Sequence, residues 1–205
     1  MLSDDRLSAL GRDVDSSVFQ NMPPRSLITM MFTDIVDSTR VKAEMGDTAY
    51  LQTVLEPHNQ LVLECVAEHN GRALKSMGDA FLVCFFTPQD GVACACEIQQ
   101  RLAASPIPTP SGPVAVRIGL HTGTPLLVPD AASGRSDISG TDVDKAARLE
   151  AAARGSQVLI SEVTKVLSNP QEVHDWGRWE LKGLGPHRLF EVLWPGPPGM
   201  NWETI

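Results

Sequence analysis

The strongest constraint on the fold is a pair of strand-like segments that are separated by only two residues. Arg72–Met77 and Ala80–Phe86 both contain many apolar residues, and Gly78-Asp79 stands between them. A Gly-Asp pair between two such segments suits a tight hairpin turn, which joins neighbouring antiparallel strands. We therefore expect a sheet that is at least partly antiparallel, with Asp79 in the turn of one hairpin.

Helix and strand patterns continue on both sides of this hairpin. Leu27–Phe32 is a continuous apolar run, as expected for a strand buried on both faces. Apolar residues recur at helical spacing through 51–66, where Pro57 is expected to bend the helix. The further expected strands are 114–121, 158–160, 173–181 and 188–194, and the further expected helices are 88–104, 142–153 and 162–167. Irregular structure is expected at 105–113 and 124–139.

The resulting order of elements is βαββαβ with additions. This order suits an α+β fold with a ferredoxin-like core, in which helices pack on one mostly antiparallel sheet. The 205 residues, 42% of them hydrophobic, are sufficient for one domain of ordinary size. We expect this domain to span 26–194, with 1–25 as a lead-in or linker containing a short helix near Asp4–Leu10, and 195–205 as a tail.

The charge of the chain argues against several classes of partner. The formal net charge is −8 and Lys and Arg do not cluster, so neither nucleic acid nor an anionic membrane is expected as a main partner. The N-terminus lacks a signal-peptide pattern, and the longest apolar run, 80–86, is too short to cross a bilayer, so we expect a cytoplasmic protein. The cysteines form no Cys-x-x-Cys pair and are expected to be buried reduced thiols: Cys65, Cys84, Cys94 and Cys96.

Two aspartates lie at the ends of apolar segments, where burial alone would not place a carboxylate. Asp34 ends the first strand and precedes a helix start, and Asp79 lies in the hairpin turn. Brought together, the two would form an oxygen-ligand site for Mg²⁺ or Mn²⁺, ions that accompany phosphate-bearing substrates. Each also has a simpler interpretation, because Asp34 is suited to cap a helix and Asp79 to form a turn. Asp37 is expected to be the cap of the following helix and to have no catalytic part.

Five further polar residues each have a functional and a structural interpretation. Lys75 precedes Asp79 by four residues and is otherwise a lysine at a sheet edge. Asp144 and Arg148 share a helix face, where the alternative is a surface salt bridge of small value. Arg117 is either a phosphate contact or a charge on an edge strand. His121 is expected to be a structural histidine with its hydrogen bonds satisfied.

Five motifs, weak individually, together resemble one family. They are similar in order and spacing to those of the catalytic domain of class III nucleotidyl cyclases, the adenylyl and guanylyl cyclases. The resemblance covers the chain from about Leu27 to Leu193. The motifs are Phe-Thr-Asp-Ile-Val-Asp-Ser-Thr from Phe32, Lys-x-x-Gly-Asp-Ala-Phe from Lys75, Arg-Ile-Gly-Leu-His-Thr-Gly from Arg117, Asp-x-x-Gly-x-x-x-Asp-x-x-x-Arg-Leu-Glu from Asp137, and Leu-Lys-Gly-Leu-Gly from Leu181.

The resemblance implies a role for each matching residue. Asp34, Asp79 and the carbonyl of Ile35 would hold two Mg²⁺ or Mn²⁺ ions, which activate the ribose 3′-hydroxyl and hold the triphosphate. The other implied roles are base recognition by Lys75 and Asp137, charge stabilisation by Arg148, a ribose contact by Asp144, triphosphate contacts by Arg117 and Lys182, and further substrate contacts by Phe32 and Thr33.

The same resemblance implies ATP as the substrate. In the family a lysine donates to adenine N1 and an aspartate accepts from the exocyclic amine, whereas guanine presents the reverse pattern. An adenylyl cyclase forming cyclic AMP and pyrophosphate is therefore expected, and a GTP cyclase or a degenerate nucleotide-binding domain with little turnover is the alternative. Asp144 supports the alternative of a degenerate domain, because the family usually has asparagine at this position and an ionised aspartate cannot donate a hydrogen bond.

Family members work as head-to-tail homodimers with shared sites. The resemblance therefore implies ATP and a second copy of the chain as partners. Thr124–Ser136 corresponds to the family's dimerisation arm and looks short in this sequence.

Overall fold

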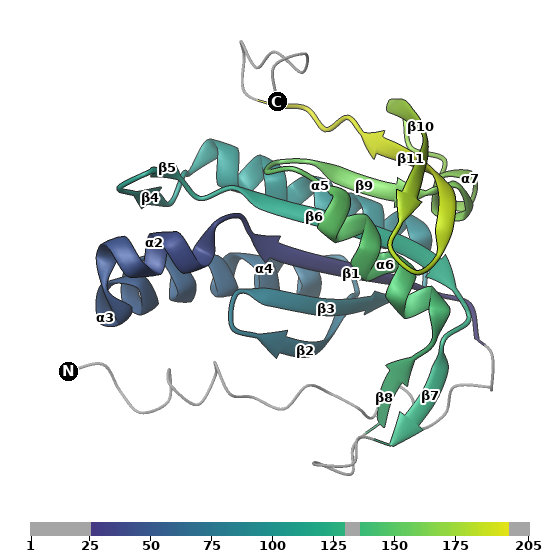
Figure 1. The fold of residues 1–205 in the computed structure, drawn as a ribbon, viewed down its shortest axis with the longest axis horizontal. Coiled ribbons are helices and arrows are strands. Elements are labelled where there is room, and N and C mark those ends of the chain that lie inside the picture. The colour runs from purple at the N-terminus through teal and green to yellow at the C-terminus, as the bar shows by residue number, and fades with distance from the viewer. Residues whose placement is uncertain (1–25, 130–135, 197–205) are drawn as a thin grey trace.

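A seven-stranded sheet runs through the molecule and carries helices on both faces (Figure 1). The computed structural model describes residues 26–129 and 136–196. The strands are β1 (Ile28–Ile35), β2 (Arg72–Met77), β3 (Ala80–Phe85), β6 (Val116–Gly123), β9 (Val158–Ser161), β10 (Val173–Leu181) and β11 (Gly185–Val192). They lie in the order β10-β11-β9-β6-β1-β3-β2, and every neighbouring pair is antiparallel except β6 and β9.

The helices fall into two groups. α4 and α5 pack on one face of the sheet, and α6 lies across the other face (Figure 1). The helices are α2 (Ser38–Met45), α3 (Asp47–Tyr50), the π-helical turn η2 (Leu51–Leu55), α4 (Glu56–Glu68), α5 (Pro88–Ala104), α6 (Thr141–Ala152) and α7 (Glu162–Ser168). Two small hairpins complete the described part, β4 (Pro108–Thr109) with β5 (Gly112–Pro113), and β7 (Leu126–Pro129) with β8 (Ser136–Ser139).

Strand β1 is buried on both faces because both helix layers cover it. Met31 and Ile35 belong to the large core between the sheet and helices α4 and α5. Met30 and Phe32, which alternate with them, contribute to a smaller core with residues of α6 and β8. The mostly apolar start of β1, in which Thr29 bonds Thr122, follows from this double coverage.

The expected α+β fold with a mostly antiparallel sheet is confirmed. The βαββαβ order is followed by β1, the helices α2–α4, β2, β3, α5 and β6, and the strands β9, β10 and β11 extend the sheet beyond β6. Thr87 and Ser161 accept hydrogen bonds from the backbone N–H of Asp90 and Thr164, and so cap α5 and α7. The expected lead-in at 1–25 and the tail from 197 lie outside the described residues.

Several expected local features were wrong. The apolar run stops at Phe32, but the first strand continues to Ile35, one residue beyond Asp34, since Thr33, Asp34 and Ile35 pair with β6. The stretch 124–139 is not wholly irregular, because Leu126–Pro129 pairs with Ser136–Ser139, and 105–113 contains the β4–β5 hairpin.

Two details at the helix starts also differ from expectation. Asp37 occupies the N-cap position of α2 with φ 56°, but its side chain makes no capping hydrogen bond and pairs with Arg40 instead. Pro57 lies in the first turn of α4 after η2. The missing N–H of a proline is tolerated there, and the irregularity takes the form of a π-helical turn before it.

Among the described residues, no helix is both long and apolar enough to span a bilayer. The four cysteines are free thiols; Cys65, Cys84 and Cys94 are buried, and Cys96 is half-buried. Burial raises the pKa of Cys65 to about 11 and that of Cys96 to about 12.

Candidate active site

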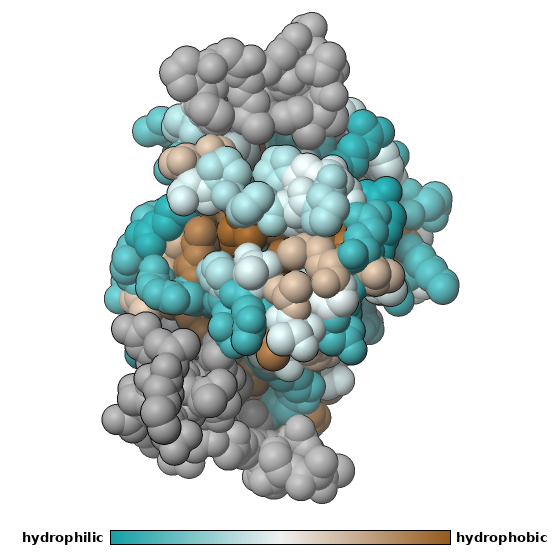
Figure 2. Space-filling view, turned by 90° about the vertical axis from the view of Figure 1, so that its left-hand side faces the viewer, coloured by the Kyte–Doolittle hydropathy of each residue, from teal (hydrophilic) through white to brown (hydrophobic). Residues whose placement is uncertain are grey.

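The two aspartates singled out by the sequence lie at the same end of the sheet. Thr33 pairs with Phe81 across β1 and β3, so the end of β1 that carries Asp34 lies beside the start of β3, which follows Asp79 directly. Gly78 and Asp79 form the two-residue turn between β2 and β3, and Gly78 adopts φ +76°, which favours glycine. Figure 1 shows this turn and the carboxyl end of β1 on the side of the sheet where α2 lies. Viewed from that end, hydrophilic side chains surround a smaller apolar area (Figure 2).

Asp34 is held by an arginine from the neighbouring strand. Arg117 stands directly opposite Asp34 in β6, and its Nη2 donates to Asp34 Oδ2 at 2.5 Å. Because β6 lies between β1 and β9, the interpretation of Arg117 as a charge on an edge strand was wrong. The helix-cap interpretation of Asp34 was also wrong, since Asp34 lies inside β1.

Arg117 has a second acidic partner that sequence reasoning missed. Its Nε lies 2.5 Å from Glu150 Oε1 of α6, although this ion pair lacks the alignment of a hydrogen bond. Burial raises the pKa of the Glu150 carboxyl to about 7, despite the opposing effect of Arg117. The sequence does indicate that Glu150 is partly buried. It follows Ala146 by four residues and is adjacent to Leu149, and these two residues form the buried face of α6.

Asp79 presents an unsatisfied oxygen to the protein interior. Its Oδ2 is buried and has no hydrogen-bond partner among the described residues. The charges of Asp79 and Asp34 reach Tyr50, where burial and both carboxylates raise the pKa to about 12. They also act on His58, but burial outweighs them and lowers the pKa of that imidazole. A buried carboxylate oxygen without a donor is costly unless a cation completes its surroundings.

The donor set around these aspartates fits a hard divalent cation. Carboxylate and carbonyl oxygens are the ligands that Mg²⁺ and Mn²⁺ prefer, and the side chains of Asp34 and Asp79 are of the first kind. Within 26–129 and 136–196, no group of three His, Cys, Asp or Glu side chains forms a complete metal cage. Mg²⁺ usually retains water and binds substrate phosphates, so it needs only one or two carboxylates from the protein.

Lys75 and Asp137, which are 62 residues apart, meet in an ion pair. Lys75 Nζ donates to Asp137 Oδ2 at 2.5 Å, and Asp137 Oδ1 accepts from the backbone N–H of Ile138. The register of β2 against β3 shifts between Ala73 and Lys75, which is a bulge at Leu74. Leu74 packs in the same cluster as Ile138, and the next residue reaches Asp137. A bulge of this kind re-aims a side chain, here toward β8.

The remaining predicted residues lie on α6 and around it. Arg148 Nε donates to the carbonyl of Lys182 at 3.2 Å, which joins α6 to the turn between β10 and β11. In the part of the chain that the structure describes, the ion pairs do not include one between Asp144 and Arg148. His121 is satisfied as expected, because Ser161 and Asp142 bond its two ring nitrogens.

Phe32 and Thr33 point to opposite faces of β1. Phe32 packs against the smaller core on the α6 side. The Thr33 side chain is only 1% exposed, and its hydroxyl has no partner among the described residues. A nucleotide contact at Thr33 would therefore involve the backbone.

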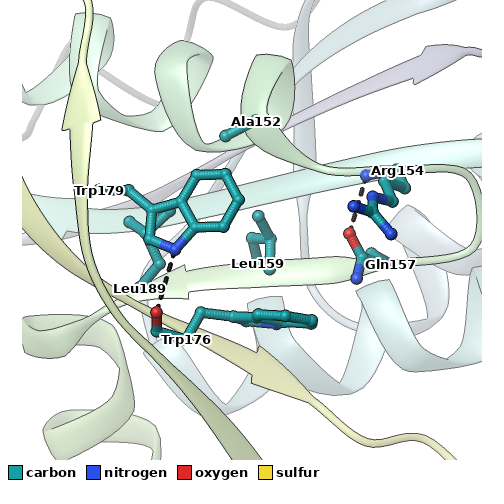
Figure 3. A pocket seen from close by; sticks show the side chains of 7 residues that line it. All are labelled: Ala152, Arg154, Gln157, Leu159, Trp176, Trp179 and Leu189. Carbon is teal, nitrogen blue, oxygen red and sulfur yellow. Dashed lines mark hydrogen bonds between the residues drawn. The ribbon is translucent and has the colours of Figure 1, made fainter. Parts of the chain in front are cut away.

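A separate pocket lies between α6 and the β10–β11 hairpin (Figure 3). The Trp176 and Trp179 side chains flank it, and Trp179 Nε1 donates to the Trp176 carbonyl. None of the candidate site residues lines it. The lining residues are Ala152, Arg154, Gln157, Leu159, Trp176, Trp179 and Leu189.

Comparison with known families gives a match over most of the chain. Residues 21–193 match the family model described as the adenylate and guanylate cyclase catalytic domain. An adenylate cyclase of Podospora anserina is 31% identical over 188 residues, which cover 80% of this chain and 8% of that protein. An adenylate cyclase of Schizosaccharomyces pombe is 26% identical and covers 94% of this chain and 13% of that protein. The chain thus spans about a tenth of the length of these curated relatives.

Solved structures share the fold. An adenylate cyclase structure from Trypanosoma brucei superposes with a TM-score of 0.73 at 24% identity, covering 88% of this chain and 92% of that one. The adenylyl cyclase CyaB from P. aeruginosa gives a TM-score of 0.68 at 24% identity, covering 85% and 97%. A rhodopsin-guanylyl cyclase core with converted specificity, in complex with ATPαS, gives 0.72 at 20% identity, covering 82% and 96%.

Proposed function

Because the chain belongs to the adenylate and guanylate cyclase catalytic domain family, we propose that it is an adenylyl cyclase. The reaction is the conversion of ATP to 3′,5′-cyclic AMP and pyrophosphate. The observation that carries the choice of ATP is the ion pair between Lys75 and Asp137.

This pair matches the edge of adenine. The ammonium of Lys75 is a donor for adenine N1, and the carboxylate of Asp137 is an acceptor for the exocyclic amine. The 2.5 Å contact between them keeps donor and acceptor side by side, as the two neighbouring positions of the base require. Guanine would place a ring N–H against the lysine and a carbonyl against the aspartate. A mismatch of buried polar groups discriminates strongly against the wrong base.

Asp34, Asp79 and the Ile35 carbonyl are the proposed holders of two Mg²⁺ or Mn²⁺ ions. The unpartnered Asp79 Oδ2 supports this role, since an oxygen-binding cation would satisfy it. When bound there, the ions would lower the pKa of the ribose 3′-hydroxyl and stabilise charge on the triphosphate.

The chain's own basic residues position and neutralise the phosphates. Arg148 is proposed to stabilise charge on the reacting phosphate, and Arg117 and Lys182 to contact the triphosphate. Arg117 donates to Asp34 in this structure, so it must exchange that partner for a phosphate. Phe32 and Thr33 contribute the strand backbone beside Asp34, and Asp144 contacts the ribose.

We place the site between two copies of the chain. The apolar side chains of Met77 and Leu126 are 56% and 61% exposed and lie in the β2–β3 and β7–β8 hairpins, which suits a surface that a second copy covers. In a head-to-tail dimer, one protomer supplies Asp34 and Asp79 and its partner supplies Lys75, Asp137, Asp144 and Arg148.

The activity test uses purified protein with Mn²⁺ and either ATP or GTP. Cyclic AMP is expected from ATP, and Asp34→Ala and Asp79→Ala should abolish it. Asp37→Ala is the matched control, because that exposed aspartate pairs only with Arg40 among the described ion pairs and should leave the rate unchanged. Cyclic GMP as the main product would refute the base assignment. Nucleotide binding with no product at high enzyme concentration would instead favour the degenerate domain, the alternative that Asp144 supports.

The shared site has its own test. Asp34→Ala and Arg148→Ala proteins, each inactive alone, should regain activity on mixing because one intact site forms per mixed dimer. No recovery would count against the head-to-tail arrangement.

A further inference from the structure

Helix α4 touches the turn that carries Asp79. Asn59 Nδ2 donates to the carbonyl of Gly78 at 3.4 Å, across 19 residues of sequence. Ser76 Oγ approaches the same carbonyl at 3.5 Å. This carbonyl belongs to the peptide unit whose nitrogen is that of Asp79, so Asn59 acts on the peptide plane from which the Asp79 side chain departs.

His58 contacts the oxygen end of the Asn59 amide. His58 Nδ1 lies 3.0 Å from Asn59 Oδ1. Because Asn59 uses Nδ2 to donate to Gly78, its Oδ1 must be the acceptor, and His58 Nδ1 carries the proton. The polar chain therefore runs from His58 Nδ1–H to Asn59 and from Asn59 Nδ2–H to the turn.

The burial of His58 calls for a reason beyond packing. The side chain is 0% exposed and lies 6.2 Å from the ring of Phe81, where an apolar residue would fill the same space. Its Nε2 has no partner among the described residues. Two other buried side-chain oxygens without a partner there are Oδ2 of Asp79, a candidate metal ligand, and Oγ1 of Thr33, the neighbour of Asp34 in β1. Unsatisfied polar atoms at or next to the candidate ligands, whose charges also act on His58, indicate a functional rather than a packing requirement.

We propose that His58 and Asn59 are positioning residues for the metal site: His58 orients the Asn59 amide, and Asn59 fixes the β2–β3 turn so that the Asp79 carboxylate faces the cation. This inference rests on the proposed function, in which Asp79 is a metal ligand. Groups that orient metal ligands typically change metal affinity by about 10- to 100-fold when they are replaced.

The test measures metal binding without turnover. Mn²⁺ is titrated into each variant in the presence of an ATP analogue that cannot cyclise, and free Mn²⁺ is followed by electron paramagnetic resonance. Asn59→Asp keeps the acceptor for His58 but loses the donor to Gly78, and should weaken Mn²⁺ binding by about 10-fold or more. Asn59 is half-buried, so this variant is expected to fold, and thermal unfolding verifies it.

Two replacements of His58 separate positioning from packing. His58→Asn places an amide where Nδ1 stands and should stay within about 3-fold of the parent affinity, a small part of the range for lost orienting groups. His58→Gln is closer to histidine in volume but moves the donor beyond Asn59, and should weaken Mn²⁺ binding by about 10-fold. The reverse order, with the Gln variant better than the Asn variant, would mean that His58 only fills space, and would overturn the proposal.

Asp79→Ala separates failure of this inference from failure of the proposed function. If Asp79→Ala weakens Mn²⁺ binding and Asn59→Asp does not, the metal site stands and the positioning role is wrong. If Asp79→Ala itself leaves Mn²⁺ binding unchanged, the proposed metal site is wrong and the positioning role is refuted with it.

Discussion

Gly119 in β6 marks the closest approach between the sheet and α6. A Cβ at this position would lie 2.0 Å from the backbone nitrogen of Glu150 and 2.7 Å from the carbonyl carbon of Leu149. These are helix backbone atoms, so no side-chain rotation relieves the clash. Since non-bonded atoms prefer about 3.5–4.0 Å, Gly119→Ala must push α6 away from β6 by about 1.5 Å.

The expected cost follows from this displacement. Overpacking of a tight contact costs about 1–3 kcal/mol, and a backbone clash this short belongs at the upper end. For a chain of this size, about 3 kcal/mol lowers the unfolding temperature by roughly 6–12 °C. α6 also carries Asp144 and Arg148, and misplacing such groups by about 1 Å costs on the order of 100-fold in rate. We therefore expect Gly119→Ala to lose about 100-fold in kcat/KM for ATP.

The assay compares thermal unfolding and initial rates of cyclic AMP formation. Gly91→Ala in α5 is the matched control, because its Cβ would meet the side chains of Thr29, Phe85 and Leu120 at 3.1–3.3 Å, and side chains can yield. The control should lose less than about 1 kcal/mol and keep its rate. A Gly119→Ala protein with the parent unfolding temperature would refute the clash. A lower unfolding temperature with an unchanged rate would refute the link between α6 and the chemistry.

Three more predictions follow from the charges and burial of the site. Burial raises the pKa of Glu150 to about 7 from the ordinary value of 4.5. Between these pH values the folded protein retains a proton that the unfolded chain releases, so the free energy of unfolding falls as pH rises. Glu150→Gln should therefore raise the unfolding temperature more at pH 8 than at pH 5, and an equal change at both would contradict the shift. Asp144→Asn should keep or raise kcat, because the amide donates where the carboxylate cannot; a large loss would give Asp144 a role of its own. At pH 8 a disulfide reagent should label Cys84 and Cys94 only after unfolding, as followed by mass spectrometry; rapid labelling of the native protein would contradict their burial.

Local patterns predicted most of the fold. The hairpin around Gly78-Asp79 was found because turn chemistry and two apolar runs agree at one place, and the observed strands β2 and β3 end within a residue of the expected bounds. The family match over 21–193 confirms the resemblance inferred from the motifs. The apolar run alone predicts β1 only as far as Phe32, because Thr33 and Asp34 are polar and their extended backbone depends on pairing with the neighbouring strands.

The pairings within the candidate site depend on distant parts of the chain. The contact of Arg117 with Asp34 follows from a register across 83 residues, and no local pattern encodes it. Glu150 was overlooked because a glutamate on a helix is usually exposed. Asp37 was expected to cap through its side chain, but its left-handed backbone turns that side chain toward Arg40.

If Asp34 binds a cation and Arg117 a triphosphate, as proposed, the position of Arg117 between Asp34 and Glu150 links the two binding events thermodynamically. A cation at Asp34 would compete with the guanidinium, and a triphosphate that draws the guanidinium away would vacate the carboxylate for the cation. By reciprocity, each ligand must raise the affinity of the other by the same factor. The arginine thereby disfavours binding of the metal without the nucleotide and of the nucleotide without the metal, so the two ligands should bind with positive cooperativity. Glu150 remains an ion-pair partner for the guanidinium after Asp34 has been released.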